Sequence, residues 1–408
     1  MSSKSNAAAR SPERMELHPN LKRLPAILIA VGLIGGLIGV FTSPKQFGYS
    51  YLLAYMFFLS IGLGGLFLTI IHHLFDASWS VPIRRLNEHF GFLLPVMAVL
   101  FIPIAILAPT IYEWMKLVPE TNHALHAKQP LLTKGGFYLV AVINFLVWGW
   151  LTWRLRYWSL EQDKTGAAKC TFAMRKHSAY GIFAFAFTLT LAAILWMQGI
   201  QFQWFSTMYG VYYFAGSVWV TLATLYLVTV ILERTGPLNG VIHRRQMHDI
   251  GVLFFAFTVF YAYIAFSQYF IIWNANIPEE TFFYTLREKG SWWQISLLLV
   301  FGHFFIPFLS LLRIDAKLSL PLMIPLIGWA WVMHFIDMSF NVVPKLHPDG
   351  FHLSWLDFTC MAFIGGVLST VWLKYFRAHA PYPIKDPRLA EGLGVHHVGA
   401  RPPIAAPQ

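Results

Sequence analysis

Histidine and carboxylate side chains in or beside long apolar stretches are the residues of this chain that could carry chemistry. An ionisable side chain is costly inside a membrane unless it is paired or hydrated, so each one is a candidate functional residue. These residues fall into two groups along the chain. The first group is His72, His73, Asp76, Glu88, His89, Glu233, His248 and Asp249. The second group is His303, His334, Asp337 and Asp357.

The first group contains a possible ion pair at the end of an apolar stretch. His72 precedes Asp76 by four residues and His73 precedes it by three. Residues at either spacing are neighbours on a helix surface. We therefore expect one of the two histidines to pair with Asp76.

The second group contains a pair that lies deeper in a membrane. His334 and Asp337 are three residues apart, so they share one face of a helix. At about 1.5 Å per residue, His334 lies roughly 21 Å along the apolar stretch that begins at residue 320, past the membrane midplane. With His303 and Asp357, this pair could form a chain of ionisable groups to the outer surface.

Three roles are open for these residues. In the structural role, residues at helix ends reach toward lipid headgroups and pairs hold helices together. Haem ligation requires paired histidines at two depths, and His303 with His334 has no second matching pair. A proton relay suits alternating carboxylate and imidazole groups, because histidine titrates near neutral pH. Two ionisable layers with an apolar middle would then be two half-channels.

The composition indicates that a membrane surrounds these groups. The chain has 408 residues, of which 57% are hydrophobic and 12% are charged, whereas soluble domains have roughly 25% charged residues. A membrane span needs about 20 mostly apolar residues. Ten stretches qualify: 24–41, 50–75, 90–111, 136–157, 178–200, 207–232, 250–272, 293–313, 320–341 and 355–376.

The distribution of basic residues predicts the orientation of these spans. Lysine and arginine collect on the cytoplasmic side. The N-terminal tail, alternate loops and the C-terminal tail hold 23 of the 30 Lys and Arg residues, which places both termini in the cytoplasm. The net charge of +11 then reflects topology and not nucleic-acid binding. We expect a cytoplasmic tail at 1–23, a membrane domain at 24–376 and a cytoplasmic tail at 377–408.

Two charged motifs suggest an internal repeat. RRLNEHFG at 84–91 and RRQMHDIG at 244–251 match in the order of their arginines, acid-or-histidine pairs and glycines. The motifs precede the third and seventh spans, on the same predicted side of the membrane. We therefore expect an all-α fold in which spans 2–5 and 6–9 form two parallel-repeat four-helix bundles, with spans 1 and 10 outside the repeat.

Small residues and the C-terminal tail give two further expectations. Gly32, Gly35, Gly36 and Gly39 form overlapping GxxxG spacings, which allow close helix packing either within the chain or against another subunit. The proline- and glycine-rich tail from Ala380 is expected to run over the surface without a core of its own.

The sequence predicts no cofactor bound by this chain and no metal site. Cys170 and Cys360 are too few for a cluster held by four cysteines, and no CxxCH motif is present. On the outer side, the amides of Gln198, Gln201 and Gln203 are candidates for quinone binding, and the alternative is a polar helix end in an aromatic belt.

These features together resemble the NrfD/polysulfide-reductase family of membrane subunits. Two stretches are similar to the smaller, ActF-type subunits of alternative complex III: WRLRYWSLEQDKTG at 153–166 and HRRQMHDIGVLFFAFTVFYAYIAFSQYFIIW at 243–273. The resemblance covers about residues 24–376. It places Glu88, His89, His248 and Asp249 at charged positions where the family is proposed to take up or release protons.

The resemblance implies a multi-pass subunit of a respiratory complex in the bacterial cytoplasmic membrane. Such a complex oxidises quinol, menaquinol included, and passes electrons to periplasmic cytochrome c or to an oxidase. Its other parts would be a sister NrfD-like subunit, an iron–sulfur protein carrying iron–sulfur clusters, multihaem cytochromes with haem c and, in one alternative, a terminal oxidase. The sister subunit has a histidine near the position of Leu63, associated with its quinol site. Leucine at this position argues against a quinol site in this chain.

We therefore expect a subunit without its own redox centre that supports assembly and conducts protons. The alternatives are a quinone-binding subunit, a structural anchor for peripheral subunits and, in a different class, a stand-alone solute transporter.

Overall fold

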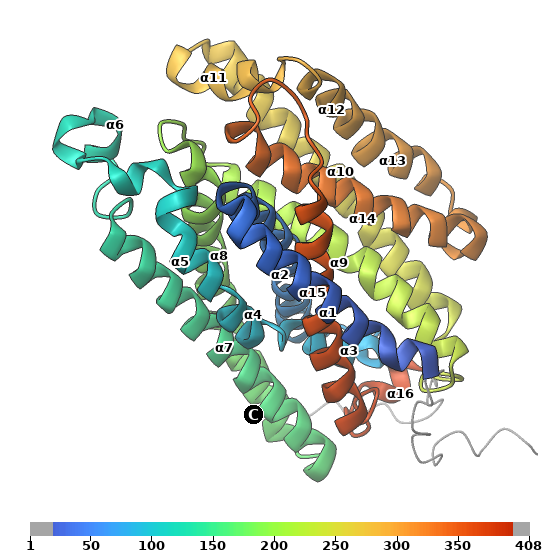
Figure 1. Ribbon diagram of the computed structural model, residues 1–408. Helices are drawn as coiled ribbons and strands as arrows, with labels where there is room; N and C mark the ends of the chain where they lie inside the picture. The colour runs from blue at the N-terminus through green and yellow to red at the C-terminus, as the bar shows by residue number, and fades with distance from the viewer. Residues whose placement is uncertain (1–18, 395–408) are drawn as a thin grey trace, which may run out of the picture.

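A computed structural model describes residues 19–394 as an all-helical protein whose long helices run side by side (Figure 1). Nine helices in the described part are long and apolar enough to cross a membrane, and one bent helix pair brings the total to ten. This number of apolar helices indicates a polytopic membrane protein. The short helices α6 and α11 lie at one end of the molecule and α16 lies at the other, hereafter the α11 end and the α16 end.

The helices agree with the predicted spans to within a few residues at most ends. The spanning helices are α1 Pro19–Thr42, α2 Pro44–Leu74, α7 Lys134–Thr165, α8 Ala168–Ala192, α9 Tyr209–Arg234, α10 Arg244–Ala275, α12 Trp292–Leu298, α13 Ile306–Leu311, α14 Leu320–Val342 and α15 Trp355–Ala378. The short helices are α6 His123–His126, α11 Pro278–Arg287 and α16 Leu389–Gly392. The π-helical turns are η3 Ala193–Met197 and η5 Leu299–Phe305, of which η5 joins α12 to α13. The 3-10 turns are η1 Glu113–Lys116, η2 Pro119–Thr121, η4 Gln198–Gln201, η6 Asp315–Leu318 and η7 Val343–Lys345.

The third predicted span is broken. It consists of α3 Val81–Gly91, α4 Leu94–Leu100 and α5 Ile102–Ile111, and the axis bends by 56° before α5. Pro95 and Pro103 stand in the first turns of α4 and α5. Proline has no backbone N–H to donate to the preceding turn, so a new helix begins at each break.

Helices α2 and α9 form the core of the molecule and pack against each other. Their apolar windows are 83% buried, against 22–44% for the other spanning helices. A side chain at Gly64 of α2 would place its Cβ 2.1 Å from the Thr221 hydroxyl of α9, so glycine is what permits this approach. Close contact through small residues is a common way for membrane helices to pack.

Helix α1 packs on α15 through its glycines. A Cβ at Gly32 would overlap Phe363, and one at Gly39 would overlap Leu356. Internal packing of this glycine face is therefore confirmed. Most of the remaining apolar side chains of α1 are exposed, including Phe41, which is 85% exposed.

The substitution Gly32→Ala tests this packing. Its Cβ would lie 2.4 Å from the backbone nitrogen of Phe363, so one of the two helices must shift. We expect a loss of about 1–3 kcal/mol of stability, seen as a lower midpoint of thermal unfolding in detergent. Gly149→Ala on α7 is the matched control, because no heavy atom lies within 4 Å of its Cβ position. Equal midpoints for the two variants would contradict the packing.

Candidate functional site

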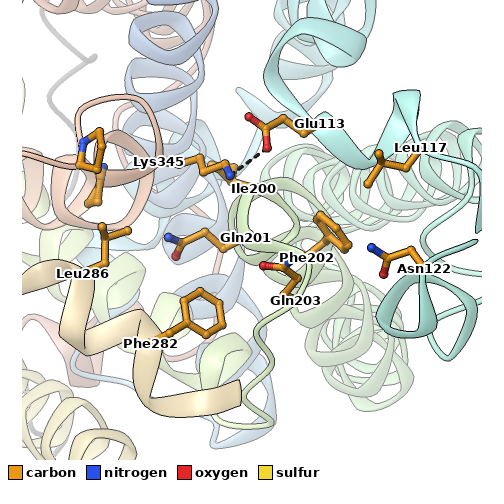
Figure 2. A pocket seen from close by; sticks show the side chains of 12 residues that line it. Glu113, Leu117, Asn122, Ile200, Gln201, Phe202, Gln203, Phe282, Leu286 and Lys345 are labelled. Carbon is orange, nitrogen blue, oxygen red and sulfur yellow. Dashed lines mark ion pairs between the residues drawn. The ribbon is translucent and has the colours of Figure 1, made fainter. Parts of the chain in front are cut away.

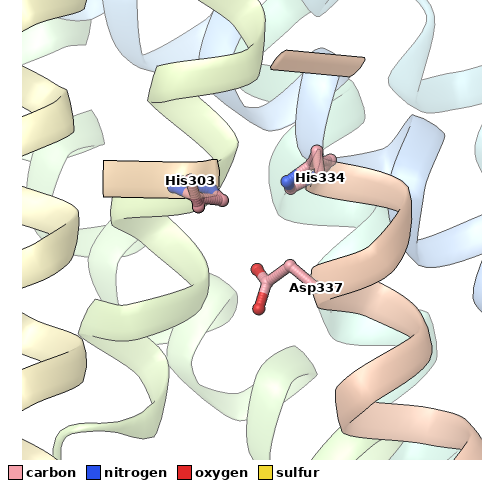
Figure 3. Close-up of side chains that lie close together, drawn as sticks. All are labelled: His303, His334 and Asp337. Atoms are coloured by element: carbon pink, nitrogen blue, oxygen red, sulfur yellow. The ribbon is translucent and has the colours of Figure 1, made fainter. Parts of the chain in front are cut away.

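Three ionisable side chains from two segments meet in the interior of the molecule. His303 lies in η5, and His334 and Asp337 lie on α14 (Figure 3). One nitrogen or oxygen from each residue lies within 4.8 Å of the others, and the three residues are at most 1% exposed. We call these residues the His–Asp cluster.

Helix α9 and helix α10 hold His303 in place. Its ring is stacked between Trp219, at a centroid distance of 3.9 Å, and Tyr261, at 3.8 Å. The π-helical turn that carries His303 is a local widening of the helix, a feature often found at functional sites. The two aromatic contacts therefore cover the faces of the ring and fix its position. They do not cover the ring edge, which carries the two nitrogens.

Hydrogen bonds satisfy only one side of each remaining member of the cluster. The Tyr212 hydroxyl donates to Asp337 Oδ1, and Asn341 Nδ2 donates to the same oxygen at 3.3 Å. His334 Nε2 lies 2.9 Å from Ser60 Oγ. The Ser60 hydroxyl donates its proton to the Phe57 carbonyl at 2.5 Å, so His334 Nε2 is the donor in its bond with Ser60.

The cluster is consequently short of protons. If His334 donates from Nε2, its Nδ1 is a bare acceptor. His334 Nδ1, Asp337 Oδ2 and both nitrogens of His303 have no hydrogen-bond partner among residues 19–394. Unpartnered buried polar atoms are rare, and they call for an explanation such as an ion, a water molecule or a reactive role. Two imidazoles and one carboxylate can hold a divalent cation or exchange a proton.

Sequence reasoning found part of this cluster. The three-residue spacing predicted that His334 and Asp337 lie on one helix face. His303, which was predicted to join them, lies beside them in the structure. The partners Ser60, Tyr212 and Tyr261 were missed, because their hydroxyls come from other helices and carry no signal in the local sequence. A donor set that could hold a metal was also not anticipated.

Polar contacts connect the cluster to the α11 end. Asn341, which donates to Asp337, also contacts Arg287 of α11. The Arg287 Nη2 group donates to the backbone carbonyl of Asn341 at 3.3 Å. Arg287 Nη1 donates to Gln201 Oε1 at 3.2 Å, and Gln201 lines a pocket. Burial lowers the pKa of Arg287 to about 10, so the guanidinium remains charged at neutral pH.

The pocket at the α11 end has a volume of about 440 Å³ (Figure 2). Its wall combines apolar side chains, among them Phe282, with the amides of Gln201 and Gln203. An ion pair between Lys345 and Glu113, at 2.8 Å, crosses its rim. Gln198, the third predicted glutamine, is not among the lining residues and donates to the Trp204 carbonyl at 3.3 Å.

Two other predicted site residues lie apart from the cluster. The Oδ2 atom of Asp357 accepts a hydrogen bond from the Ser354 backbone at 2.9 Å and caps α15. Asp357 thus caps a helix, because the first turn supplies this carboxylate with a backbone donor, and the chain through it stays a prediction. Glu233 is half-buried in the last turn of α9.

The first charged motif forms a buried ion network at the α16 end. Arg84 Nε lies 3.1 Å from Glu88, and Arg85 Nη1 lies 2.9 Å from the other oxygen of the same carboxylate. Arg84 also pairs with Asp386 and Arg85 with Asp163. The C-terminal segment thus enters the network, contrary to the expectation that it only runs over the surface.

The predicted pairing of Asp76 with His72 or His73 is wrong. Helix α2 ends at Leu74, and Asp76 has a left-handed φ of 51°, so helical spacing does not extend to it. Asp76 instead pairs with Arg175 and, at 2.9 Å, with Arg388.

The histidines of this end are buried in three different environments. His72 Nδ1 lies 2.5 Å from Ser80 Oγ, and His89 Nδ1 lies 3.1 Å from Arg156 Nη1. His73 has no hydrogen-bond partner among the described residues on either nitrogen. The predicted members of this layer therefore share a region without forming one chain.

The second charged motif has the same order of residues but a different environment. Arg245 is 61% exposed and lies 3.8 Å from Asp249. His248 and Asp249 are each 30% exposed and lie 3.5 Å apart. Gln246 donates to the Gly392 carbonyl at 2.7 Å, so both motifs contact the C-terminal segment at the α16 end.

An apolar layer separates the two ends. Helix α2 carries no histidine or carboxylate between Ser60, which contacts the cluster, and His72. These positions are 12 residues apart, or about 18 Å along the helix. The interval includes Leu63, which is fully buried.

Comparison with known proteins adds no assignment. No model of a known protein family matches the sequence, and no curated protein matches it. We therefore infer the function from the geometry described above and from the resemblance of the sequence motifs.

Charge holds the C-terminal segment in place. Burial alone would raise the pKa of Asp386, but the charge of Arg84 and the bonds and charge of Arg388 outweigh it and lower the pKa to about 2. A depressed carboxyl pKa means that the folded state favours the ionised form. The stabilisation from Asp386 is complete above its unfolded pKa of about 4 and is lost as the pH falls toward 2.

The substitution Asp386→Asn should loosen the segment. It removes one of the two carboxylates that neutralise the charge of Arg84. Breaking a buried ion pair costs about 3–5 kcal/mol of folding free energy. Hydrogen exchange of residues 386–392 at pH 7 should increase, and the wild type alone should lose protection as the pH falls from 4 to 2. Glu391→Gln, which alters only an exposed hydrogen bond with Ser78, should leave exchange unchanged. Equal exchange in the wild type and Asp386→Asn would refute the role of this ion pair.

Proposed function

We propose that this chain is an NrfD-type membrane subunit of a bacterial respiratory complex that oxidises quinol, and that it conducts protons through the His–Asp cluster. The chain would carry no redox centre of its own. Quinol or menaquinol, haem c and iron–sulfur clusters would belong to its partners: a sister subunit, an iron–sulfur protein, multihaem cytochromes and, in one alternative, a terminal oxidase.

The packing of the helices supports the parallel repeat on which this proposal draws. If spans 2–5 correspond to spans 6–9, α2 corresponds to α9, and these are the two central helices. Helix α2 packs on α3 and α8, and α9 packs on the corresponding helices α10 and α14. Both charged motifs contact the C-terminal segment, which is consistent with a shared membrane face.

The single observation that carries the proton-conducting role is the set of unpartnered atoms in the cluster. His334 Nδ1 and Asp337 Oδ2 are acceptors without a donor among residues 19–394, and aromatic rings pack around the two histidines. A proton bound between such groups supplies the missing donor. Neutral histidine and ionised aspartate can each take up a proton and release it again, which is the property a relay needs.

The direction of exchange follows from the polar contacts and the apolar layer. The positive-inside distribution supports an orientation with the α16 end in the cytoplasm and the α11 end outside. The contacts through Asn341, Arg287 and Gln201 run toward the α11 end. Arg287 cannot release its proton at neutral pH, so it positions neighbouring amides and does not itself transfer protons. We therefore propose exchange of protons between the cluster and the outer side.

The substitution Asp337→Asn tests this proposal. We expect the complex to assemble and to oxidise quinol, while the number of protons released per electron in liposomes falls measurably. The reason is that an amide of the same shape retains a hydrogen-bonding oxygen but cannot exchange a proton at neutral pH.

The matched control is Asp357→Asn, a buried carboxylate that caps a helix outside the cluster. It should leave the proton-to-electron ratio unchanged. A ratio in the assembled Asp337→Asn complex equal to that of the wild type would rule out proton conduction at this site. A lower yield of complex with an unchanged ratio would assign the cluster a structural role.

A second candidate function is quinone binding at the pocket of the α11 end. The pocket combines apolar walls with three side-chain amides, those of Asn122, Gln201 and Gln203, and this combination suits a ring that carries two carbonyl oxygens. Arg287 orients the Gln201 amide by donating to its oxygen, which leaves the amide nitrogen to donate to a ligand.

For this candidate, Gln201→Met should raise the KM for quinol roughly tenfold, as expected from losing one hydrogen bond of about 1–1.5 kcal/mol. Steady-state quinol oxidation by the assembled complex measures it. Gln294→Met, an exposed change on α12 outside the pocket, is the control. Unchanged kinetics in both variants would leave quinol oxidation to a partner subunit.

A further inference from the structure

An arginine on the outward-facing side of α7 lacks an acidic partner. Arg154 is half-buried and forms no ion pair with any residue between 19 and 394. Its Nε donates to His177 Nε2 of α8 at 3.2 Å. Its two Nη groups make no hydrogen bond within the described part of the chain, so the outer edge of the guanidinium is available to a ligand.

His177 fixes the direction of this guanidinium. Trp158 Nε1 also donates to His177 Nε2, at 3.2 Å, so this nitrogen is an acceptor and the imidazole proton lies on Nδ1. Nδ1 in turn contacts the Tyr180 hydroxyl. The histidine is therefore a neutral acceptor that holds the arginine without compensating its charge.

Aromatic rings surround the arginine on its outward side. The guanidinium carbon lies 5.5 Å from the ring of Trp153, 5.9 Å from Tyr157 and 5.6 Å from Trp158. Trp153 and Tyr157 are 51% and 45% exposed. Exposed Trp and Tyr mark the level of the lipid headgroups in membrane proteins.

The position along α7 agrees with this level. Arg154 is 20 residues after the first residue of α7, or about 30 Å along the helix, which is the thickness of the hydrocarbon core. The last turns of α7, from Glu161 to Thr165, are polar and extend beyond the neighbouring helices in Figure 1. The arginine thus lies at the boundary between hydrocarbon and headgroups.

A second cation lies on the adjacent helix. Lys176 is exposed and precedes Tyr180 by one helical turn, so it lies on the side of α8 that carries Tyr180, whose ring contacts His177. The two acids nearest in the sequence, Glu161 and Asp163, already pair with Lys164 and Arg85, and Asp76 pairs with Arg175 and Arg388. Two uncompensated cations in an aromatic belt match the charge and geometry of a phosphodiester.

We propose that Arg154 and Lys176, together with Trp153, Tyr157 and Trp158, bind the headgroup of an anionic phospholipid. Arg154 offers its Nη fork to the phosphate oxygens, Lys176 adds a point charge, and the rings pack on the glycerol and upper acyl carbons. This lipid site lies at the boundary of the molecule and is independent of proton conduction and quinone chemistry.

Native mass spectrometry of the full chain, within its complex if it forms one, tests this site. Phosphatidylglycerol and phosphatidylcholine with the same acyl chains are added separately to protein in detergent micelles. We expect tighter binding of one phosphatidylglycerol molecule. Arg154→Gln and Lys176→Gln should each weaken it roughly fivefold, the effect of one basic residue near an anionic lipid.

The control removes the same charge elsewhere. Arg313→Gln, on the far side of the chain and beside Asp315, should leave lipid binding unchanged. Unfolding midpoints measured without added lipid show whether a variant is merely destabilised, and the exposed Lys176→Gln keeps the test valid if Arg154→Gln fails to fold. Equal binding of the two lipids by the wild type, unaltered binding in Lys176→Gln, or displacement of the lipid by millimolar inorganic phosphate would overturn the proposal.

Discussion

The contact between α2 and α9 is the constraint on which the interior of this protein depends. Glycine at position 64 lets the two helices approach at Thr221, and both helices are covered on nearly all sides. This approach brings Ser60 of α2 and Tyr212 of α9 within hydrogen-bond distance of His334 and Asp337 on α14. Because the hydroxyls come from two central helices, the His–Asp cluster has fixed partners on one side, with Tyr212 as a donor and Ser60 as an acceptor. Its other side has no hydrogen-bond partner among residues 19–394.

The two charged motifs show how one pattern of residues takes on two physical states. In the first copy, Arg84 is fully buried, because Asp386 of the C-terminal segment covers it. In the second copy, Arg245 is exposed and its contact with Asp249 is long. Buried ion pairs specify one arrangement because an unpaired buried charge is costly, whereas exposed pairs contribute little. The first motif therefore holds the C-terminal segment against the end of the bundle. The second motif remains accessible to solvent or to a partner.

Hydropathy predicted the spans well because the cost of exposing backbone polar groups to lipid leaves helices as the only choice for these stretches. The His334–Asp337 pair followed from helical spacing alone. The predicted pairing of His72 with Asp76 was wrong because the helix ends between them. Asp357 caps α15, a role that its spacing from the other acids does not reveal. The position of His303 beside this pair depends on packing between helices, and no local pattern in the sequence encodes that contact.

The apolar layer of α2 limits what the cluster can do by itself. Between Ser60 and His72, about 18 Å of helix carries no histidine or carboxylate, and Leu63, one turn from Ser60, is fully buried. Side chains of α2 alone cannot carry a proton across that distance, because each transfer needs hydrogen-bond reach. Under the proposed function, protons bound at the cluster therefore exchange with the α11 side. Transport across the whole membrane then requires a second path in a partner subunit, or a motion that admits water past Leu63. A sealed ion network at the α16 end and an exchanging cluster near the α11 end are consistent with a subunit that completes one half of such a path.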